Sequence, residues 1–558
     1  MVFKHTRTMK KSMKIFFFIF FPFLSFSQTT YLPQGAKENL LLERLEIKAQ
    51  TDSVLNFSKT KPFSRRLVVP AMQRLDSDLK LSQVDKYNLY TAKLSNLEFV
   101  DQDSTLLSKK SIGPFYKTPA NLFEVERPDF SLIINPVFQY TVGKESNSNE
   151  HLFFNSRGIT LRGGIANKIG FSAYITDNQE RDPAYVRQWV AERQAVPGEG
   201  YYKEFKGNGY DYFDARGYVT FNITKYIDAA FGYDKNFIGN GYRSLFLSDF
   251  SNSTLFLKLN TRIWKFNYQN LFMELVNADS RGADRLLGKK YAATHHLDFA
   301  LTNWLNVGVF ETIVFGRKDH FEFGYLNPVI FYKSIEQQQG SADNTLAGLD
   351  AKANVARHLQ FYGQFLLDDL KLSEINSSWW GNKFGYQLGA KYIDALNISN
   401  LDLQVELNHV RPFTYSHNDS VSNYTHNNQP LAHPLGANFN ELIGLLRYQP
   451  APKWTISAKA IYYVQGKDTA RESFGGNIFL PNVFPYRQRE YGYDIGAGIR
   501  SKVAYSSLLL SYEVKPNLFL ETNAVLRKNN ATILNPGKDA FIINAGVRWN
   551  MQRREFDF

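Results

Sequence analysis

The stretch 423–441 (NYTHNNQPLAHPLGANFNE) carries residue types that could bind a metal ion or a sugar. Three histidines lie in it or shortly before it: His417, His426 and His433. No carboxylate or second histidine falls at a compact ligand spacing around them, so we expect no metal site. The amide side chains, together with Tyr415 and Tyr424, suit hydrogen bonds to sugar hydroxyls and stacking against sugar rings. A folded loop or plug without a ligand is the alternative.

Charged side chains extend this candidate site, because arginine forms charge-assisted hydrogen bonds to acidic sugars. The residues predicted to contact polysaccharide are Arg243, Arg411, Tyr415, Tyr424, His426, Gln429, His433 and Asn438. The sequence lacks the G-x-S-x-G and H-E-x-x-H motifs of hydrolases and metalloproteases, so we predict neither catalysis nor a cofactor. An active site assembled from separate surface loops is the alternative to that interpretation.

The N-terminus has the pattern of a secretory signal peptide, predicted to span residues 1–27. Five basic residues precede a short apolar core at 15–26, and Ser25 and Ser27 supply small residues for cleavage before Gln28. The formal charge of +12 includes those five basic residues, so the exported chain is only mildly basic. Cysteine is absent, which rules out disulfides. We expect no nucleic-acid partner, because the chain is predicted to be exported and none of its basic runs carries interleaved stacking aromatics.

From Phe130 onward, apolar residues recur at every second position, which is typical of β-strands. In the clearest case Leu403, Val405 and Leu407 share one face of a strand, while Gln404 and Glu406 share the other. One face of such a strand would meet lipid and the other a polar interior. A soluble sandwich would show the same alternation, so the period alone does not decide between them.

The lengths of the links between strands favour a membrane barrel. Short links are expected at 167–168, 224–226, 260–262, 302–304, 356–358, 394–400, 449–453 and 515–517. Longer polar links are expected at 142–151, 179–214, 237–253, 276–294, 317–345, 370–383, 412–439, 466–490 and 529–539. The two kinds alternate if 491–514 is one strand, which gives 18 strands with both termini on the short-link side. The predicted fold is an all-β, 18-stranded antiparallel transmembrane β-barrel at 126–558 with long extracellular loops.

A small helical periplasmic region is predicted at 28–125. Residues 35–50 and 81–99 have helical periodicity, and Ser82 and Asp85 have the spacing of a capping box. We expect 59–70 to be extended. A further helix is predicted at 181–195, with Asp182 as its cap and Pro183 at its first position. The terminal Phe558 is consistent with insertion by the outer-membrane assembly machinery.

Charged residues on the predicted lumen face are mostly basic, which favours an acidic ligand; a mutually paired interior in a plugged barrel is the alternative. These residues are Arg162, Arg216, Lys258, Lys391, Glu406, Arg447, Lys459, Arg500, Glu521, Arg527 and Arg548.

Four stretches resemble the Wzi-type capsule assembly proteins, and among them the gliding motility protein RemB group. They are GNGYRSLFLSDFSNSTLFLKL, FYGQFLLDDL, LDLQVELNHVRPFTYSH and YTHNNQPLAHPLGANFNEL. The resemblance extends over most of residues 120–558. It implies an 18-stranded outer-membrane barrel with a periplasmic helical part, which helps to hold or assemble surface polysaccharide without catalysis and without a cofactor.

The predicted function is therefore non-enzymatic assembly or attachment of surface polysaccharide at the cell outer membrane, with a role in gliding motility. The expected partners are surface polysaccharide, outer-membrane lipid and lipopolysaccharide, the outer-membrane assembly machinery during biogenesis, and gliding-machinery proteins. Two alternatives stay open: a porin-like channel for small anionic solutes, and a motility component that binds other surface proteins.

Overall fold

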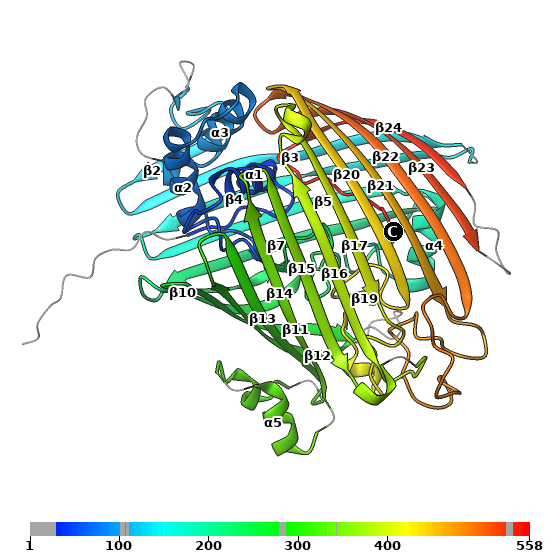
Figure 1. Cartoon of the computed structure of the whole chain (residues 1–558). Helices are drawn as coiled ribbons and strands as arrows, with labels where there is room; N and C mark the ends of the chain where they lie inside the picture. The colour runs from blue at the N-terminus through cyan, green and yellow to red at the C-terminus, as the bar shows by residue number, and fades with distance from the viewer. Residues whose placement is uncertain are drawn as a thin grey trace, which may run out of the picture.

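The computed structural model describes residues 29–100, 106–107, 111–146, 148–277, 286–318, 320–329, 331–341, 343–375, 377–531 and 539–558. The predicted signal peptide lies outside the described residues. Eighteen antiparallel strands close into a barrel through the pairing of the last strand with the first, in which Gly546 faces Thr141 (Figure 1). The predicted strand count and closure are confirmed.

The barrel strands follow one another around the wall in chain order. They are β3 (Phe130–Glu145), β4 (His151–Ile165), β5 (Ile169–Arg181), β7 (Gly209–Asn222), β8 (Ile227–Asp234), β10 (Thr254–Ile263), β11 (Phe266–Asn277), β12 (Gly288–Ala300), β13 (Leu305–Phe315), β14 (Asn344–Val355), β15 (Leu359–Asp369), β16 (Lys383–Tyr392), β17 (Leu401–Val410), β20 (Phe439–Ala451), β21 (Trp454–Lys467), β22 (Ile499–Lys515), β23 (Leu518–Ala531) and β24 (Ala540–Trp549). Two short strands extend the sheet: β2 (Phe123–Arg127) pairs with β3, and β6 (Lys203–Phe205) pairs with β7.

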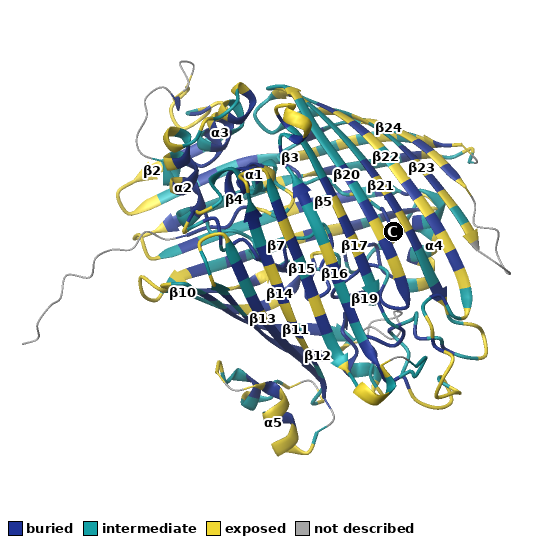
Figure 2. Ribbon diagram, viewed as in Figure 1, coloured by how far each residue is buried: buried dark blue, intermediate teal, exposed yellow. Residues whose placement is uncertain are grey.

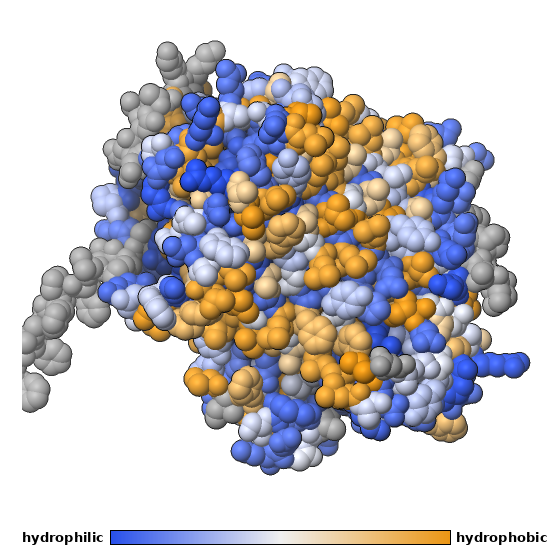
Figure 3. All heavy atoms as spheres, in the orientation of Figure 1, coloured by the Kyte–Doolittle hydropathy of each residue, from blue (hydrophilic) through white to orange (hydrophobic). Residues whose placement is uncertain are grey.

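Exposed and buried residues alternate along the strands of the wall (Figure 2). The exposed side chains are mostly apolar, and many of the buried ones are polar. Val405 and Leu407 are exposed, whereas Gln404, Glu406 and Asn408 are buried inside. Figure 3 shows the apolar residues spread over the strands, while the loops at the lower end of the view are more hydrophilic. This is the alternation that the sequence predicts. Among the described helices, none combines the length and the apolar character that crossing a membrane requires.

One predicted strand is wrong in its extent. Residues 491–498 belong to the long loop, and β22 begins at Ile499. Gly492, Gly496 and Gly498 have φ values of 94°, 82° and 88°, a backbone conformation that interrupts a strand. The prediction that Arg500 faces the lumen is also wrong, because Arg500 shares the exposed face of β22 with Lys502, while Ser501 and Val503 share the buried face.

The N-terminal region is a three-helix unit of α1 (Lys37–Ala49), α2 (Arg65–Asp78) and α3 (Gln83–Ser95). The capping box of Ser82 and Asp85 is confirmed. The expectation that 59–70 is extended is wrong beyond β1 (Thr60–Lys61), because α2 starts at Arg65 and contains Pro70. Proline inside a helix costs about 3 kcal/mol, and burial of the α2 side chains Val68, Val69, Ala71, Met72 and Leu75 offsets that cost.

This helical unit closes the short-turn end of the barrel. Arg44 of α1 makes ion pairs with Asp394, at 2.9 Å, and with Asp402, and Arg66 of α2 pairs with Asp228 at 2.8 Å. In addition, β1 pairs with β9 (Phe237–Ile238), which lies inside the barrel. We call residues 29–100 the plug.

The long loops and the chain end occupy much of the remaining lumen. The helix α4 (Ala184–Arg193) begins one residue later than predicted, with Pro183 rather than Asp182 at the cap position and no side-chain capping bond. Residues 550–558 follow β24 and turn into the barrel, where Asp557 pairs with Arg243 at 3.0 Å and Lys459 at 2.5 Å (Figure 1). Phe558 packs there against Trp189, so the aromatic at the end of the last strand is Trp549 and not Phe558.

Loop 316–343, in contrast, lies against the outside of the wall. It carries α5 (Tyr332–Gln339), and Tyr332 stacks on His295, which is on the outer face of β12. The other described short elements are β18 (Thr425–His426) with β19 (Gln429–Pro430), and the 3₁₀ turns Leu97–Phe99, Phe323–Leu326, Leu372–Glu374, Ala395–Asn397 and Ser420–Ser422.

Candidate carbohydrate-binding surface

The loop that carries most of the predicted contact residues, 411–438, folds inward and becomes part of the core. Tyr415 and Tyr424 are both 1% exposed, and their hydroxyls donate to the backbone carbonyls of Leu245 and Phe246, at 2.8 and 2.7 Å. Their rings stack at 5.8 Å. We call loop 411–438 the inner loop.

The polar side chains of the inner loop are bound to protein atoms. Asn438 donates to the carbonyls of Gly466, Phe474 and Ala497 and accepts from the amide of Gly496. Gln429 donates to the carbonyl of Glu199 and accepts from the amide of Gly198. The amides and hydroxyls that suggested sugar binding therefore hold this loop to its neighbours.

The two buried histidines have the same role. His426 accepts from the amide of Val276 at 2.9 Å through Nδ1, and its Nε2 lies 3.0 Å from the carbonyl of Ser253. His433 Nε2 lies 2.7 Å from a carboxylate oxygen of Glu441, and both side chains are fully buried. Among the described residues, no group of three or more histidine, aspartate or glutamate side chains is placed to hold a metal ion.

The two predicted arginines lie in different surroundings. Arg243 is buried in the lumen between Asp557 and Glu441, at 3.0 and 3.6 Å. Arg411 donates to the carbonyls of Asn382 and Trp379, at 2.7 and 3.0 Å. The structure therefore does not bring the eight predicted residues together on one accessible surface, and direct contact between them and a sugar stays a prediction. Among the eight, Arg411 is the residue that binds the backbone of loop 370–382.

An exposed aromatic surface is formed instead by two other long loops, 370–382 and 468–498. Phe484, Tyr486 and Tyr491 are 79%, 42% and 52% exposed. Trp379 and Trp380 lie half-buried at the base, with their rings 5.9 Å apart. We call these five residues the ring patch. The sequence did contain a signal for it, because SSWWG and VFPYRQREYGY concentrate aromatic residues beside arginine.

Glu490 holds the two loops of the ring patch together. Its Oε2 accepts hydrogen bonds from the indole nitrogens of Trp379 and Trp380, at 3.2 and 2.8 Å. Arg487 donates to the other oxygen of Glu490 at 2.6 Å and stacks over the Trp380 ring at 4.0 Å. The hydrogen bond from Arg487 lowers the pKa of Glu490, so its carboxylate stays charged at neutral pH. The patch thus combines exposed rings with fixed donors and acceptors, which is what sugar recognition requires.

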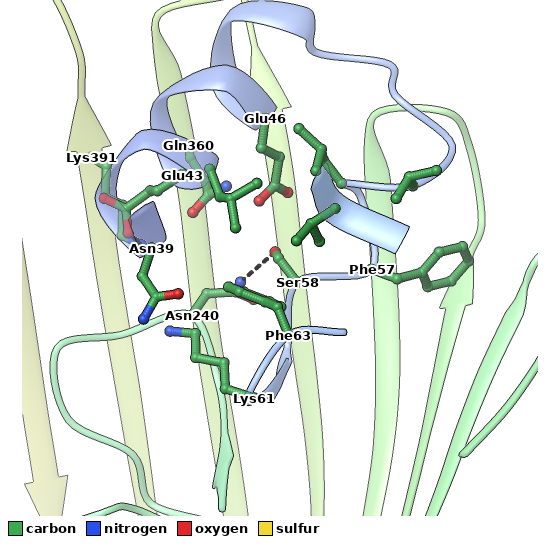
Figure 4. Close-up of a pocket in the computed structure, with 14 residues that line it drawn as sticks. Asn39, Glu43, Glu46, Phe57, Ser58, Lys61, Phe63, Asn240, Gln360 and Lys391 are labelled. Carbon is green, nitrogen blue, oxygen red and sulfur yellow. Dashed lines mark hydrogen bonds and ion pairs between the residues drawn. The ribbon is translucent and has the colours of Figure 1, made fainter. Parts of the chain in front are cut away.

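A small pocket of about 30 Å³ lies between the plug and the wall (Figure 4). Glu43 of α1 pairs there with Lys391 at 2.7 Å and Arg447 at 3.5 Å, and Asn240 donates to Ser58 at 3.0 Å. Burial would raise the pKa of Glu43, but Lys391 and Arg447 lower it to about 2. The predicted excess of positive charge in the lumen is thus partly neutralised by the plug.

Comparisons with known proteins agree with this architecture. Residues 134–518 match the model of the family described as "Capsule assembly protein Wzi". The chain belongs to this family. Its fold is similar to that of Wzi from Escherichia coli, with a TM-score of 0.57 at 14% identity, covering 94% of this chain and 100% of Wzi.

Wzi is described as an outer-membrane protein involved in group 1 capsule assembly and as a carbohydrate-binding β-barrel. Lower similarity links the chain to OprD from Pseudomonas aeruginosa, with a TM-score of 0.43 at 13% identity, covering 75% of this chain and 94% of OprD. A search of curated proteins found no match.

Proposed function

We propose that the protein is an outer-membrane barrel that holds surface polysaccharide at its ring patch, as a binding protein and not as an enzyme. Membership of the Wzi family supports a role in capsule assembly. The observation that carries the assignment to a surface is the set of exposed rings on loop 468–498, beside loop 370–382, whose two tryptophans donate to Glu490. In a barrel whose short-turn end carries the plug, these loops lie at the opposite, extracellular end.

The proposed mechanism is adhesion through many weak contacts. Exposed rings such as Phe484 and Tyr491 would stack against sugar rings, and each such contact contributes about 1 kcal/mol. Exposed arginines such as Arg471 and Arg489 would add hydrogen bonds to acidic sugars. A long polymer engages several copies of the protein, so modest affinity at each patch gives firm attachment.

The resemblance to the gliding motility protein RemB group supports a finer proposal, in which the polysaccharide belongs to the surface layer that gliding cells use. A deletion strain would separate the roles. Loss of both stained surface polysaccharide and colony spreading supports the joint role, whereas loss of spreading with normal polysaccharide supports a motility component that binds other surface proteins.

The decisive test replaces Phe484, Tyr486 and Tyr491 together with alanine. Retention of purified acidic capsular polysaccharide by the protein in detergent should fall at least tenfold, which corresponds to about 1.4 kcal/mol. Tyr90→Ala is the matched control, because Tyr90 is 44% exposed on α3 at the other end of the molecule. Unchanged retention in the triple variant would refute the assignment to the ring patch.

The porin-like alternative makes a different prediction for the same purified protein. An 18-stranded barrel encloses a wide pore unless something fills it, and here the plug, the inner loop and residues 550–558 lie within it. We therefore expect little steady conductance in a planar bilayer. A large, stable conductance would favour the channel.

A further inference from the structure

Charged residues on the outside of the barrel wall are unevenly distributed. The strands β21, β22, β23, β24 and β3 are neighbours in that order around the wall. In the halves of these strands that lie toward the long loops, the charged residues on the outward face are Lys144, Arg500, Lys502 and Lys528. All four are exposed and basic. This side of the wall therefore carries positive charge alone at its long-loop end.

Two outward-facing basic residues elsewhere on the wall have acidic partners on the next strand. Arg157 of β4 pairs with Asp177 of β5 at 2.8 Å. Lys289 of β12 pairs with Glu274 of β11, also at 2.8 Å. In both places an acidic neighbour on the wall itself neutralises the basic side chain. The side formed by β21 to β24 and β3 has a different arrangement.

Three of its basic residues, Arg500, Lys502 and Lys528, form a group that we call the basic cluster. Arg500 and Lys502 are two residues apart on one face of β22, which separates their Cα atoms by about 7 Å. Lys502 pairs with Asn530 and Ala504 pairs with Lys528, so Lys528 lies diagonally across from Lys502, about 7–8 Å away. Within the described part of the chain, Lys502 and Lys528 form no ion pair. Like charges at this spacing repel one another, so an anion between them is favourable.

The basic cluster lies where the lipid-facing part of the wall ends. At the short-turn end of β22, the ring of Tyr512 packs against that of Trp454, with centroids 4.8 Å apart, and aromatic side chains of this kind mark the edge of the membrane. A strand crosses the hydrocarbon layer in about 9–11 residues. A crossing of that length, counted from Tyr512, ends at Lys502. The outward-facing residues Leu508 and Leu510 between them are exposed and apolar.

This position favours phosphate carried on a lipid over phosphate in solution. Lysine and arginine bind phosphate through charge-assisted hydrogen bonds. Leu526 is two residues from Lys528 on the same face of β23, and it pairs with Phe541 of β24. Both Leu526 and Phe541 are exposed. Acyl chains can cover these side chains while the phosphate meets the lysines, whereas a free phosphate ion gains the second contact alone.

We propose that the basic cluster is a binding site for a phosphate-bearing lipid of the outer leaflet. The site lies on the outside of the wall, and the ring patch lies on the long loops. The proposal therefore goes beyond polysaccharide binding and does not rest on it.

The test uses the full exported chain, freed of lipid in detergent, with lipid A that carries both of its phosphates as the probe. Native mass spectrometry should show saturable binding of lipid A. Replacing Lys502 and Lys528 together with glutamine should weaken that binding at least tenfold. The matched control replaces Lys333 and Lys371 with glutamine. It changes the net charge equally, and each of these side chains is 59% exposed and pairs with a glutamate three residues later.

Further probes and variants identify the group that is recognised. Dephosphorylated lipid A keeps the sugars and acyl chains, and it should bind at least tenfold more weakly. Inorganic phosphate at the concentration of the lipid should not displace lipid A. Lys502→Arg combined with Lys528→Arg keeps the charge and should bind lipid A as the unmodified protein does. The proposal is overturned if the double glutamine variant binds lipid A normally, if dephosphorylated lipid A binds equally well, or if inorganic phosphate displaces lipid A.

Discussion

The inner loop and loop 468–498 are similar in length, and each combines side-chain amides with aromatic rings, but the first is buried and the second is partly exposed. Both join neighbouring strands at the long-loop end. The inner loop has five asparagines, two tyrosines and one phenylalanine, and loop 468–498 has two asparagines, three tyrosines and three phenylalanines. In the inner loop Gln429, His433 and Asn438 are completely buried, whereas Phe484 in the other loop is 79% exposed. Composition suited to sugar binding therefore does not by itself identify a binding surface.

The difference lies in the apolar residues that accompany the polar ones. The inner loop contains Leu431, Ala432 and Ala437, which are at most 1% exposed and pack with Leu245 and Phe246 in one cluster. Burying such residues inside the barrel draws the neighbouring amides and hydroxyls in with them, where each must find a partner. In loop 468–498 the exposed apolar and aromatic residues cluster at 483–491, at a distance in sequence from the buried Ile478.

Among the substitutions that test this difference between the two loops, Asn438→Ala should have the largest effect on stability. The substitution removes hydrogen bonds to three carbonyls and one amide, at a residue whose φ is 59°. We expect a loss of about 3–4 kcal/mol in the free energy of unfolding, measured in urea with the barrel in lipid vesicles. Asn438→Gly, which tolerates the left-handed backbone, should recover about 1 kcal/mol of that loss. A loss below 0.5 kcal/mol, the range of ordinary surface changes, would contradict a structural role.

A smaller loss is expected for His433→Leu. The buried Glu441 carboxylate would lose its 2.7 Å partner but keep its hydrogen bond from Asn408 at 3.0 Å. We expect unfolding to become easier by about 2–3 kcal/mol in the same assay. Gln488→Ala, on the exposed loop, is the control and should change stability by less than about 0.5 kcal/mol. If His433→Leu and Gln488→Ala had equal stability, the inner loop would not be more important for stability than loop 468–498.

Trp380→Ala should change stability little and polysaccharide binding more, which is the reverse of what we expect for the inner loop. It removes one ring of the patch and the stacking partner of Arg487, which costs about 1 kcal/mol of stability. Retention of capsular polysaccharide should nevertheless fall several-fold, because the ring patch loses part of its support. If Trp380→Ala lost as much stability as His433→Leu and still retained polysaccharide fully, the role of Trp380 would be structural.

The smallest expected effect is the dependence of the ring patch on low pH. Glu490 has a lowered pKa in the folded protein, so its contribution to stability is present above the unfolded pKa of about 4.3 and is lost as the pH falls through the lower folded value. Solvent screening makes that contribution small, because the site is exposed. As the pH falls through that lowered folded pKa, the two loops of the ring patch should separate, with a change in tryptophan fluorescence that Glu490→Gln abolishes.

The plug provides the reference for that titration. The pKa of Glu43 is lowered to about 2 by Lys391 and Arg447, so this ion pair persists until the pH approaches 2. Pepsin should therefore begin to cleave α1–α3 only near pH 2. Simultaneous loss of both would mean that the exposed contact is as strongly held as the buried one.

The amino-acid sequence by itself determined the barrel. Strand alternation and the sorting of links by length are local properties, because each strand must present an apolar and a polar face whatever the loops do. The α1 and α3 helices are likewise set by local periodicity, and in α3 by the capping residues Ser82 and Asp85. The missed helix α2 and the shortened β22 show the limit of that reasoning. Burial stabilises the first despite Pro70, and positive-φ glycines before Ile499 delay the start of the second.

Only the tertiary structure decided which polar residues are buried and which are exposed. A loop's amides and rings have the same chemistry in solvent and in a core, and the choice depends on the space that the barrel leaves and on distant segments that fill it. Tyr415 is buried because Leu245 lies 170 positions away in sequence but within hydrogen-bond distance. The ion pair of Lys459 with Asp557 likewise joins a strand to a chain end that meet only when the barrel closes.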